Sequence, residues 1–253
     1  MDPCEGPSPG LLYNLRVMAE GSSVLLATAA TVGLVHTLLG PDHYLPFVVM
    51  ARAWRWSTAR TALITLLCGI GHVGSSVVLG LIGAALGVAV ERLVAVESLR
   101  GEVASWMLIA FGLVYTVYGL RLAMRGKKHS HVHVHEDGAA HAHEHAHVGE
   151  HTHVHTGERP NMTPWVLFTI FVFGPCEPLI PLVMYPAMAH SYGLMMQVAI
   201  VFSVITIATM LVVVLLGARG LELLPAGRLE RYSHALAGAA VLLSGLAIRF
   251  LGL

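Results

Sequence analysis

Charged side chains are scarce in this chain of 253 residues: only 12% are Asp, Glu, Lys or Arg, while 55% are hydrophobic. Soluble domains carry about twice that share of charge. The formal net charge is zero, and no basic stripe with interleaved aromatic residues occurs, so the electrostatic footprint of a nucleic-acid-binding protein is missing. Together with a mean hydropathy of +0.69, this composition predicts an integral membrane protein.

Cysteine is also rare. Cys4, Cys68 and Cys176 lie at scattered positions, which give neither a disulfide framework nor a C-x-x-C motif. The phosphate-binding pattern G-x-x-x-x-G-K-S/T is absent, so direct use of ATP is not expected. The N-terminal residues lack the basic region of a cleavable signal peptide, and we therefore expect the first hydrophobic segment to be retained.

Long apolar runs dominate the chain instead. At roughly 20 apolar residues per span, six spans are predicted, at 23–52, 59–90, 102–124, 164–188, 193–217 and 233–252. They follow an N-terminal tail (1–22) and form two groups of three, 23–125 and 164–253, joined by the segment 126–163. Because three is odd, the second group is inverted in the membrane. The predicted fold is an all-α polytopic membrane protein with two inverted three-helix repeats.

Two Gly-Pro sequences interrupt the first and fourth spans. Gly40 to Leu45 reads G-P-D-H-Y-L, and Gly174 to Leu179 reads G-P-C-E-P-L. Glycine ends one half-helix and proline begins the next, where its missing N–H is harmless. The following side chains lie in a first helical turn, where partial positive charge favours carboxylate and thiolate. Paired broken helices of this kind form the midplane site of many transporters.

The candidate metal ligands lie at these breaks and on the second span. Imidazole with carboxylate suits Ni, Co, Zn or Cu better than Mg or Ca, although a buried polar network at a helix break is an alternative. His72 can be a ligand or a hydrogen-bonded structural residue. Cys176 can instead be a small core residue, and Glu177 can carry a coupling proton. The predicted ligands are His36, Asp42, His43, His72, Cys176 and Glu177.

The central segment 126–163 contains eleven histidines, largely as alternating H-x-H. Its low complexity predicts disorder in the absence of metal. Neutral imidazoles can bind several metal ions there, whereas the alternatives are a solvated spacer and a pH-responsive linker. The predicted auxiliary ligands are His129, His131, His133, His135, His141, His143, His145, His147, His151, His153 and His155.

The distribution of Lys and Arg predicts the orientation. Eleven of these residues lie at the connections between spans 1 and 2, 3 and 4, and 5 and 6, against four on the opposite side. By the positive-inside rule the first set and the histidine-rich segment are cytoplasmic, and both termini are outside a cell membrane.

The combination of H-x5-D-H on one membrane helix, G-H on the next, a histidine-rich central loop and G-P-C-E-P-L-I-P resembles the nickel/cobalt transporter superfamily. The similarity is closest to its urease-accessory-type permeases and covers roughly residues 23 to 252. It implies that His36, Asp42 and His43 select the metal and that His72 is a further ligand. The classical permeases have four residues between His and Asp, and this chain has five, 37–41.

The predicted function is transport of Ni²⁺ or Co²⁺ as substrate, by secondary or facilitated alternating access, and not enzymatic catalysis. No cofactor is expected. The resemblance favours uptake, with a cytoplasmic metallochaperone or nickel-enzyme maturation factor as a candidate partner. Efflux through the same site is the first alternative.

Two further alternatives concern other chemistry. Pro175-Cys176 also resembles the membrane thiol-disulfide electron carriers related to cytochrome-c biogenesis, which need a cysteine at both breaks. The first break has Asp42 instead. Export of sulfite or an organosulfonate would need cationic anion sites, and no Lys or Arg lies deep in a predicted span.

Overall fold

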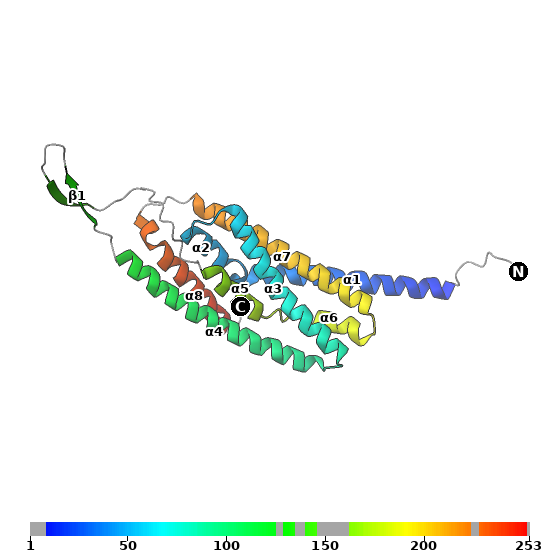
Figure 1. Cartoon of the computed structure of the whole chain (residues 1–253). Helices are drawn as coiled ribbons and strands as arrows, with labels where there is room; N and C mark the ends of the chain where they lie inside the picture. The colour runs from blue at the N-terminus through cyan, green and yellow to red at the C-terminus, as the bar shows by residue number, and fades with distance from the viewer. Residues whose placement is uncertain (1–8, 125–128, 135–139, 146–161, 224–227, 252–253) are drawn as a thin grey trace.

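The computed structural model describes residues 9–124, 129–134, 140–145, 162–223 and 228–251. The part of the chain outside the central segment is helical, as predicted (Figure 1). Its helices are α1 (Pro9–Leu39), α2 (Leu45–Ala53), α3 (Thr58–Ala85), α4 (Val90–Met124), α5 (Thr163–Phe173), α6 (Leu179–Met188), α7 (Tyr192–Glu222) and α8 (Ser233–Leu251). Two short 3-10 helices, η1 (Pro41–His43) and η2 (Arg228–Tyr232), precede α2 and α8.

Five segments within the described ranges are long and apolar enough to cross a membrane: Glu20–Leu39, Thr58–Ala85, Val90–Met124, Tyr192–Glu222 and Glu230–Leu251. The predicted span 164–188 is divided between α5 and α6, which have 11 and 10 residues. Because a helix needs about 20 residues to cross a bilayer, neither crosses it alone. The first predicted span also differs, since α1 is already long enough and α2 follows as a separate short helix.

Both Gly-Pro sequences interrupt the helices at the predicted residues. Gly40 follows α1 with φ −85° and ψ 102°, and Pro41 begins η1. Gly174 follows α5 with φ −58° and ψ 133°, and the chain re-enters a helix only after Pro178. These ψ values are extended, so each glycine ends the helix. Proline lacks an N–H group, so it cannot continue the preceding hydrogen-bond ladder.

Helices α4 and α8 pack against each other along much of their length. Glycines allow this approach: a Cβ at Gly119 would clash with the backbone of Ala235, and a Cβ at Gly112 would clash with the backbone of Leu242. As the numbers rise along α4 they fall along α8, so the two helices are antiparallel. Small residues allow close backbone packing in membranes, where hydrophobic burial alone does not drive helices together.

The helices on either side of each Gly-Pro break pack against long helices of the other half of the chain, and the two halves do so in the same pattern. Helix α1 contacts α7, and α5 contacts α3. Helix α2 contacts α7 and α8, while α6 contacts α3 and α4, and α3 and α7 contact each other. In Figure 1 the short helices α2, α5 and α6 lie among the long ones. Both Gly-Pro breaks are therefore surrounded by protein, where irregular backbone at membrane depth is tolerated.

Part of the central segment forms strands where the composition predicted disorder. Strand β1 (His129–Val134) pairs antiparallel with β2 (Ala140–His145), so that His129, His131 and His133 are opposite His145, His143 and His141. The reason is the alternation of His with mostly apolar residues, whose period of two matches a strand. The remaining predicted auxiliary ligands lie outside the described residues: His135, His147, His151, His153 and His155.

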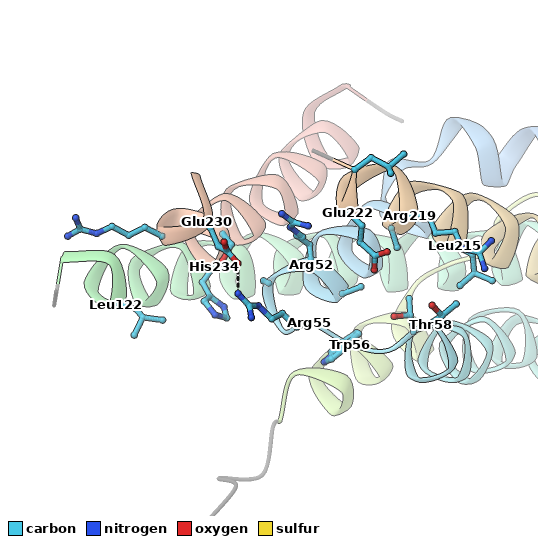
Figure 2. A pocket seen from close by; sticks show the side chains of 17 residues that line it. Arg52, Arg55, Trp56, Thr58, Leu122, Leu215, Arg219, Glu222, Glu230 and His234 are labelled. Atoms are coloured by element: carbon cyan, nitrogen blue, oxygen red, sulfur yellow. Dashed lines mark hydrogen bonds and ion pairs between the residues drawn. The ribbon is translucent and has the colours of Figure 1, made fainter. Parts of the chain in front are cut away.

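A cavity of about 740 Å³ lies where α2 ends and η2 meets α8 (Figure 2). Arginines dominate its charged lining, which comprises Arg52, Arg55, Arg219, Arg231, Glu222 and Glu230. An ion pair between Arg55 and Glu230 crosses its edge. Its excess of positive charge makes stable binding of a metal cation in this arginine-lined cavity unfavourable.

Candidate metal site

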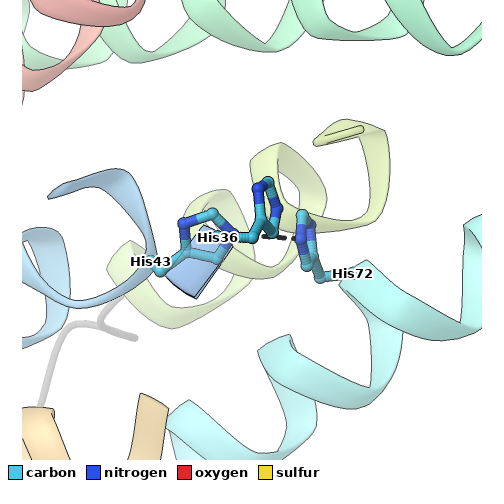
Figure 3. A group of neighbouring side chains, drawn as sticks. All are labelled: His36, His43 and His72. Carbon is cyan, nitrogen blue, oxygen red and sulfur yellow. Dashed lines mark hydrogen bonds between the residues drawn. The ribbon is translucent and has the colours of Figure 1, made fainter. Parts of the chain in front are cut away.

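Two histidines that flank the first break meet a third from α3 in the interior (Figure 3). His36 lies in the last turn of α1, His43 ends η1, and His72 lies near the middle of α3. One ring nitrogen of each lies within 4.8 Å of those of the other two. The break at Gly40 makes this possible, because the 3-10 turn brings the ring of His43 to 4.7 Å from that of His36.

The closest approach in this histidine cluster joins His43 and His72. Their Nε2 atoms are 3.3 Å apart, and their ring planes meet at 85°. Two nitrogens that bind one tetrahedral metal ion at about 2.05 Å lie about 3.3 Å from each other. A hydrogen bond between neutral rings has a similar length, so the distance by itself is compatible with both uses.

Asp42 contacts Nδ1 of His43, the ring nitrogen that does not face His72. Its Oδ1 and the carbonyl oxygen of Gly40 are both 3.1 Å from Nδ1 of His43. Both neighbours are acceptors, so Nδ1 carries the proton and Nε2 presents its lone pair toward His72. A carboxylate that orients a metal-binding histidine in this way raises its basicity as a ligand. The structure thus puts Asp42 beside the cluster instead of within its group of three ligand atoms.

The position of His43 requires the glycine at the break. The histidine ring folds back over Gly40, and a Cβ at that residue would lie 2.8 Å from Oδ1 of Asp42 and closer still to the ring of His43. Any other residue would push the ring away. Gly40 therefore serves both to end α1 and to admit the His43 ring.

Two nitrogens of the cluster have no hydrogen-bond partner within the described part of the chain. They are Nε2 of His36 and Nδ1 of His72, and both are buried. Only 2% of His43 and 2% of His72 is exposed. A buried polar atom without a partner costs about 1–3 kcal/mol. The unpaired nitrogen of His36 favours a ligand site over a structural hydrogen-bond network, whereas the ring of His72 also has the backbone of Phe171 beside it.

The histidine cluster opens into a cavity of about 630 Å³, called the metal cavity below, and both halves of the chain line it. Asp42 and the three histidines are on one wall, and Gly174, Pro175 and Glu177 of the second break are on another. Helices α4 and α8 contribute Glu102 and Arg249, whose side chains form an ion pair of 3.2 Å. Glu177 therefore shares a cavity with the cluster, as its predicted role requires, although it is outside the group of three nitrogens.

Cys176 occupies a different environment. It is fully buried and is not among the described residues that line the metal cavity. Its backbone N–H donates to Oγ of Ser76 at 3.3 Å and to Oε2 of Glu97 at 3.2 Å. This location matches the alternative of a small core residue. A role for Cys176 as a metal ligand stays a prediction without a contact to support it.

Glu97 and Arg100 are not among the predicted site residues. The predicted third span begins at residue 102, which leaves both in the connection before it, but α4 begins at Val90 and includes them. Glu97 is fully buried and its Oε1 is 2.6 Å from Nη1 of Arg100. The expectation that no Lys or Arg lies deep in a predicted span did not include Arg100, because the predicted span 102–124 begins after it. The detectable signal was the spacing of three residues, which places opposite charges on one helix face.

Two aromatic residues lie between the metal cavity and the arginine-lined cavity. Phe47 of α2 lies one turn after His43 and one turn before Ala51, which lines the arginine-lined cavity. Its ring is 4.7 Å from that of Phe171 of α5, and Phe171 also contacts His72. Phe47 has no exposed surface and Phe171 has 4%. Along the chain, the buried ring of Phe47 thus lies between His43, which lines the metal cavity, and Ala51, which lines the arginine-lined cavity.

Comparison of the chain with protein-family models, curated proteins and solved structures finds no match.

Proposed function

We propose that this protein transports a divalent transition metal ion, Ni²⁺ or Co²⁺, across a membrane. The observation that carries the proposal is the meeting of His36, His43 and His72 beside an open cavity. Imidazole nitrogen is a preferred ligand of such metals. With three protein nitrogens, the remaining coordination positions are free for water or Glu177, so the ion can enter and leave without the protein unfolding.

The proposed architecture is six spans in two inverted repeats. The first repeat comprises α1 with α2, then α3 and α4, and the second comprises α5 with α6, then α7 and α8. In this scheme α5, the break and α6 cross the membrane together as one discontinuous span. The reciprocal contacts support it, because α1 packs on α7 in the same way that α5 packs on α3. The self-paired contacts of α3 with α7 and α4 with α8 also fit a two-fold relation.

The two cavities support alternating access. The metal cavity reaches the histidine cluster, and in this scheme Phe47 and Phe171 form an apolar barrier between it and the arginine-lined cavity. Transport requires that the repeats move so that the barrier opens on one side of the ion and a second closure forms on the other. Exchange of a proton at Asp42 or Glu177 for the metal would couple the flux to a proton gradient, and flux that is independent of pH would disprove this coupling.

Uptake is the proposed direction. The metal cavity borders the N-terminal half of α4 and the C-terminal end of α8, which the positive-inside rule assigns to the outer side. The arginine-lined cavity and the histidine-rich segment are then cytoplasmic, with both termini outside. Metal released there would meet the histidines of the central segment, and a cytoplasmic metallochaperone or maturation factor would be its acceptor.

The two other candidate chemistries have weaker support. Cys68 and Cys176 are both free and buried, and the residue at the first break is an aspartate, so a disulfide between the breaks cannot form. Arg100 is a partly buried cation, but its guanidinium already contacts Glu97, Ser75 and the carbonyl of Val172. It therefore offers no free site for sulfite.

Flux into proteoliposomes tests the proposal, with Ni²⁺, Co²⁺, Zn²⁺ and sulfite compared side by side. Ni²⁺ or Co²⁺ flux should be lost in His43→Ala and His72→Ala. The matched control is His190→Asn, because His190 is exposed, is remote from the cluster in sequence and has φ 54°, which asparagine tolerates. Sulfite flux without metal flux, or equal metal flux in all variants, would overturn the proposal.

A further inference from the structure

The second helix break interrupts the backbone hydrogen bonds of the helix, and two side chains of α4 bond to the two groups that one of these bonds would have joined. In a continuous helix the N–H of Cys176 would donate to the carbonyl of Val172, four residues earlier. The extended Gly174 separates these two groups. The carbonyl of Val172 instead accepts from Nη2 of Arg100 at 2.7 Å, and the N–H of Cys176 donates to Oε2 of Glu97 at 3.2 Å.

Glu97 and Arg100 bond to each other through their remaining atoms, Oε1 and Nη1, at 2.6 Å. The ion pair therefore spans the gap and gives each separated backbone group a charged partner. Hydrogen bonds to charged groups are stronger than those between neutral groups, and at membrane depth an unpaired carbonyl or N–H costs several kcal/mol. These hydrogen bonds explain why the carboxylate of Glu97 can be fully buried.

The same face of α4 also accommodates the backbone of the break. Glu97, Arg100 and Gly101 are spaced i, i+3 and i+4, so they share a face. A Cβ at Gly101 would lie 2.7 Å from Cγ of Pro175. The glycine thus lets the break lie close enough for both hydrogen bonds to form.

The network reaches the histidine cluster by two routes. Nη2 of Arg100 contacts Oγ of Ser75 at 2.5 Å, and that hydroxyl donates to the carbonyl of His72 at 2.8 Å. On the other side, Gly174 abuts the His72 ring, since a Cβ there would lie 3.1 Å from Nδ1. The position of His72 therefore depends on α3 and on the second break, and Arg100 bonds to both.

The geometry points to Glu97 and Arg100 as positioning residues that replace the missing hydrogen bond between Val172 and Cys176 and thereby hold His72 in place for the metal. Among the described residues the first break has no such charged clamp: the equivalent carbonyl, that of Leu38, instead has the hydroxyl of Tyr44 as its side-chain partner at 3.5 Å. The part of this inference that concerns metal affinity rests on the proposed function, whereas the part that concerns the break does not.

Two measurements on the full-length protein separate these parts. The first is the labelling rate of Cys176 by a maleimide in a Cys4→Ser, Cys68→Ala background, because a thiol with no exposed surface reacts only when the break opens. The second is the affinity for Ni²⁺ by calorimetry. Glu97→Gln and Arg100→Gln should each raise the labelling rate roughly tenfold to a hundredfold, the factor that corresponds to one buried charged partner lost. Ni²⁺ affinity should fall by roughly tenfold or more in the same variants.

Glu91→Gln is the matched control for labelling, since Glu91 lies in the first turn of α4, is exposed and is not among the described residues that line either cavity. Cys176 in this control variant should react with maleimide as slowly as in the parent protein. Arg100→Lys keeps the charge but loses the planar fork, so an intermediate labelling rate is expected. This variant also provides a test if Glu97→Gln does not fold.

Unchanged Cys176 labelling in monodisperse Glu97→Gln and Arg100→Lys would overturn the positioning role. Faster labelling with unchanged Ni²⁺ affinity would retain the clamp on the break and overturn its link to His72. If the parent itself binds no Ni²⁺ while labelling still rises, the proposed function fails and the clamp stands.

Discussion

The Nε2 atoms of His43 and His72 lie 3.3 Å apart although 29 residues separate them in the chain. His43 is held by its own turn, where Gly40 and Asp42 accept from its Nδ1. His72 is held by its position in the middle of α3 and by the second helix break beside it. The cluster thus joins a locally organised ligand to one that depends on packing between the halves.

Asp42→Asn should weaken Ni²⁺ binding by about tenfold to a hundredfold without abolishing it, because Asp42 orients His43 from behind. His43→Ala should remove high-affinity binding, since it deletes a ligand nitrogen. Calorimetry gives the affinities, and X-ray absorption of the bound metal gives the number of imidazoles. A missing oxygen ligand in the Asp42→Asn spectrum would show instead that Asp42 contacts the ion directly.

Phe47→Leu should let Ni²⁺ leak down its gradient in both directions, because it removes one ring of the apolar barrier. The conservative size change keeps the loss of stability small. The measurement is release of trapped Ni²⁺ from proteoliposomes. Phe111→Leu is a control of the same chemistry on α4, where the ring packs against Tyr115 and is not among the described residues that line either cavity. Equal release by both variants would contradict the barrier.

Gly119→Leu should destabilise the protein, because a Cβ at this position collides with the backbone of Ala235 on α8. Overpacking typically costs about 1–3 kcal/mol, and here the obstacle is backbone that cannot rotate away. Thermal melting in detergent, followed by size-exclusion chromatography, measures the effect. Gly74→Leu is the control, since nothing lies within 4 Å of its Cβ position. A Gly119→Leu melting temperature equal to that of Gly74→Leu would show that α4 and α8 are not so tightly packed.

Removal of residues 129–155 should lower the number of Ni²⁺ ions bound per chain but leave one high-affinity site and Ni²⁺ flux. The eleven histidines of this segment are separate in sequence from the cluster of His36, His43 and His72. Equilibrium dialysis gives the stoichiometry and proteoliposome assays give the flux. Complete loss of flux would mean that the segment is an obligatory part of the pathway.

Local sequence chemistry was sufficient for several features. Both helix breaks were predictable because the effects of Gly40-Pro41 and Gly174-Pro175 act within one turn. The apolar runs predicted most of the long helices, because length and composition alone decide whether a helix can cross a membrane. Their limits were less predictable: α4 extends to Val90 and thereby includes Glu97 and Arg100, since helix propensity continues through charged residues that later find buried partners.

The sequence by itself determined that the chain is built of apolar helices, where two of them break, and which residue types stand at the breaks. Each of these depends on neighbours in the chain. Only the tertiary structure decided that His72 joins His36 and His43, that Cys176 turns into the core, and that Glu97 and Arg100 bridge the second break. Those outcomes depend on which helices pack together and in what register, and no local pattern specifies the distance between side chains that are 29 or more residues apart.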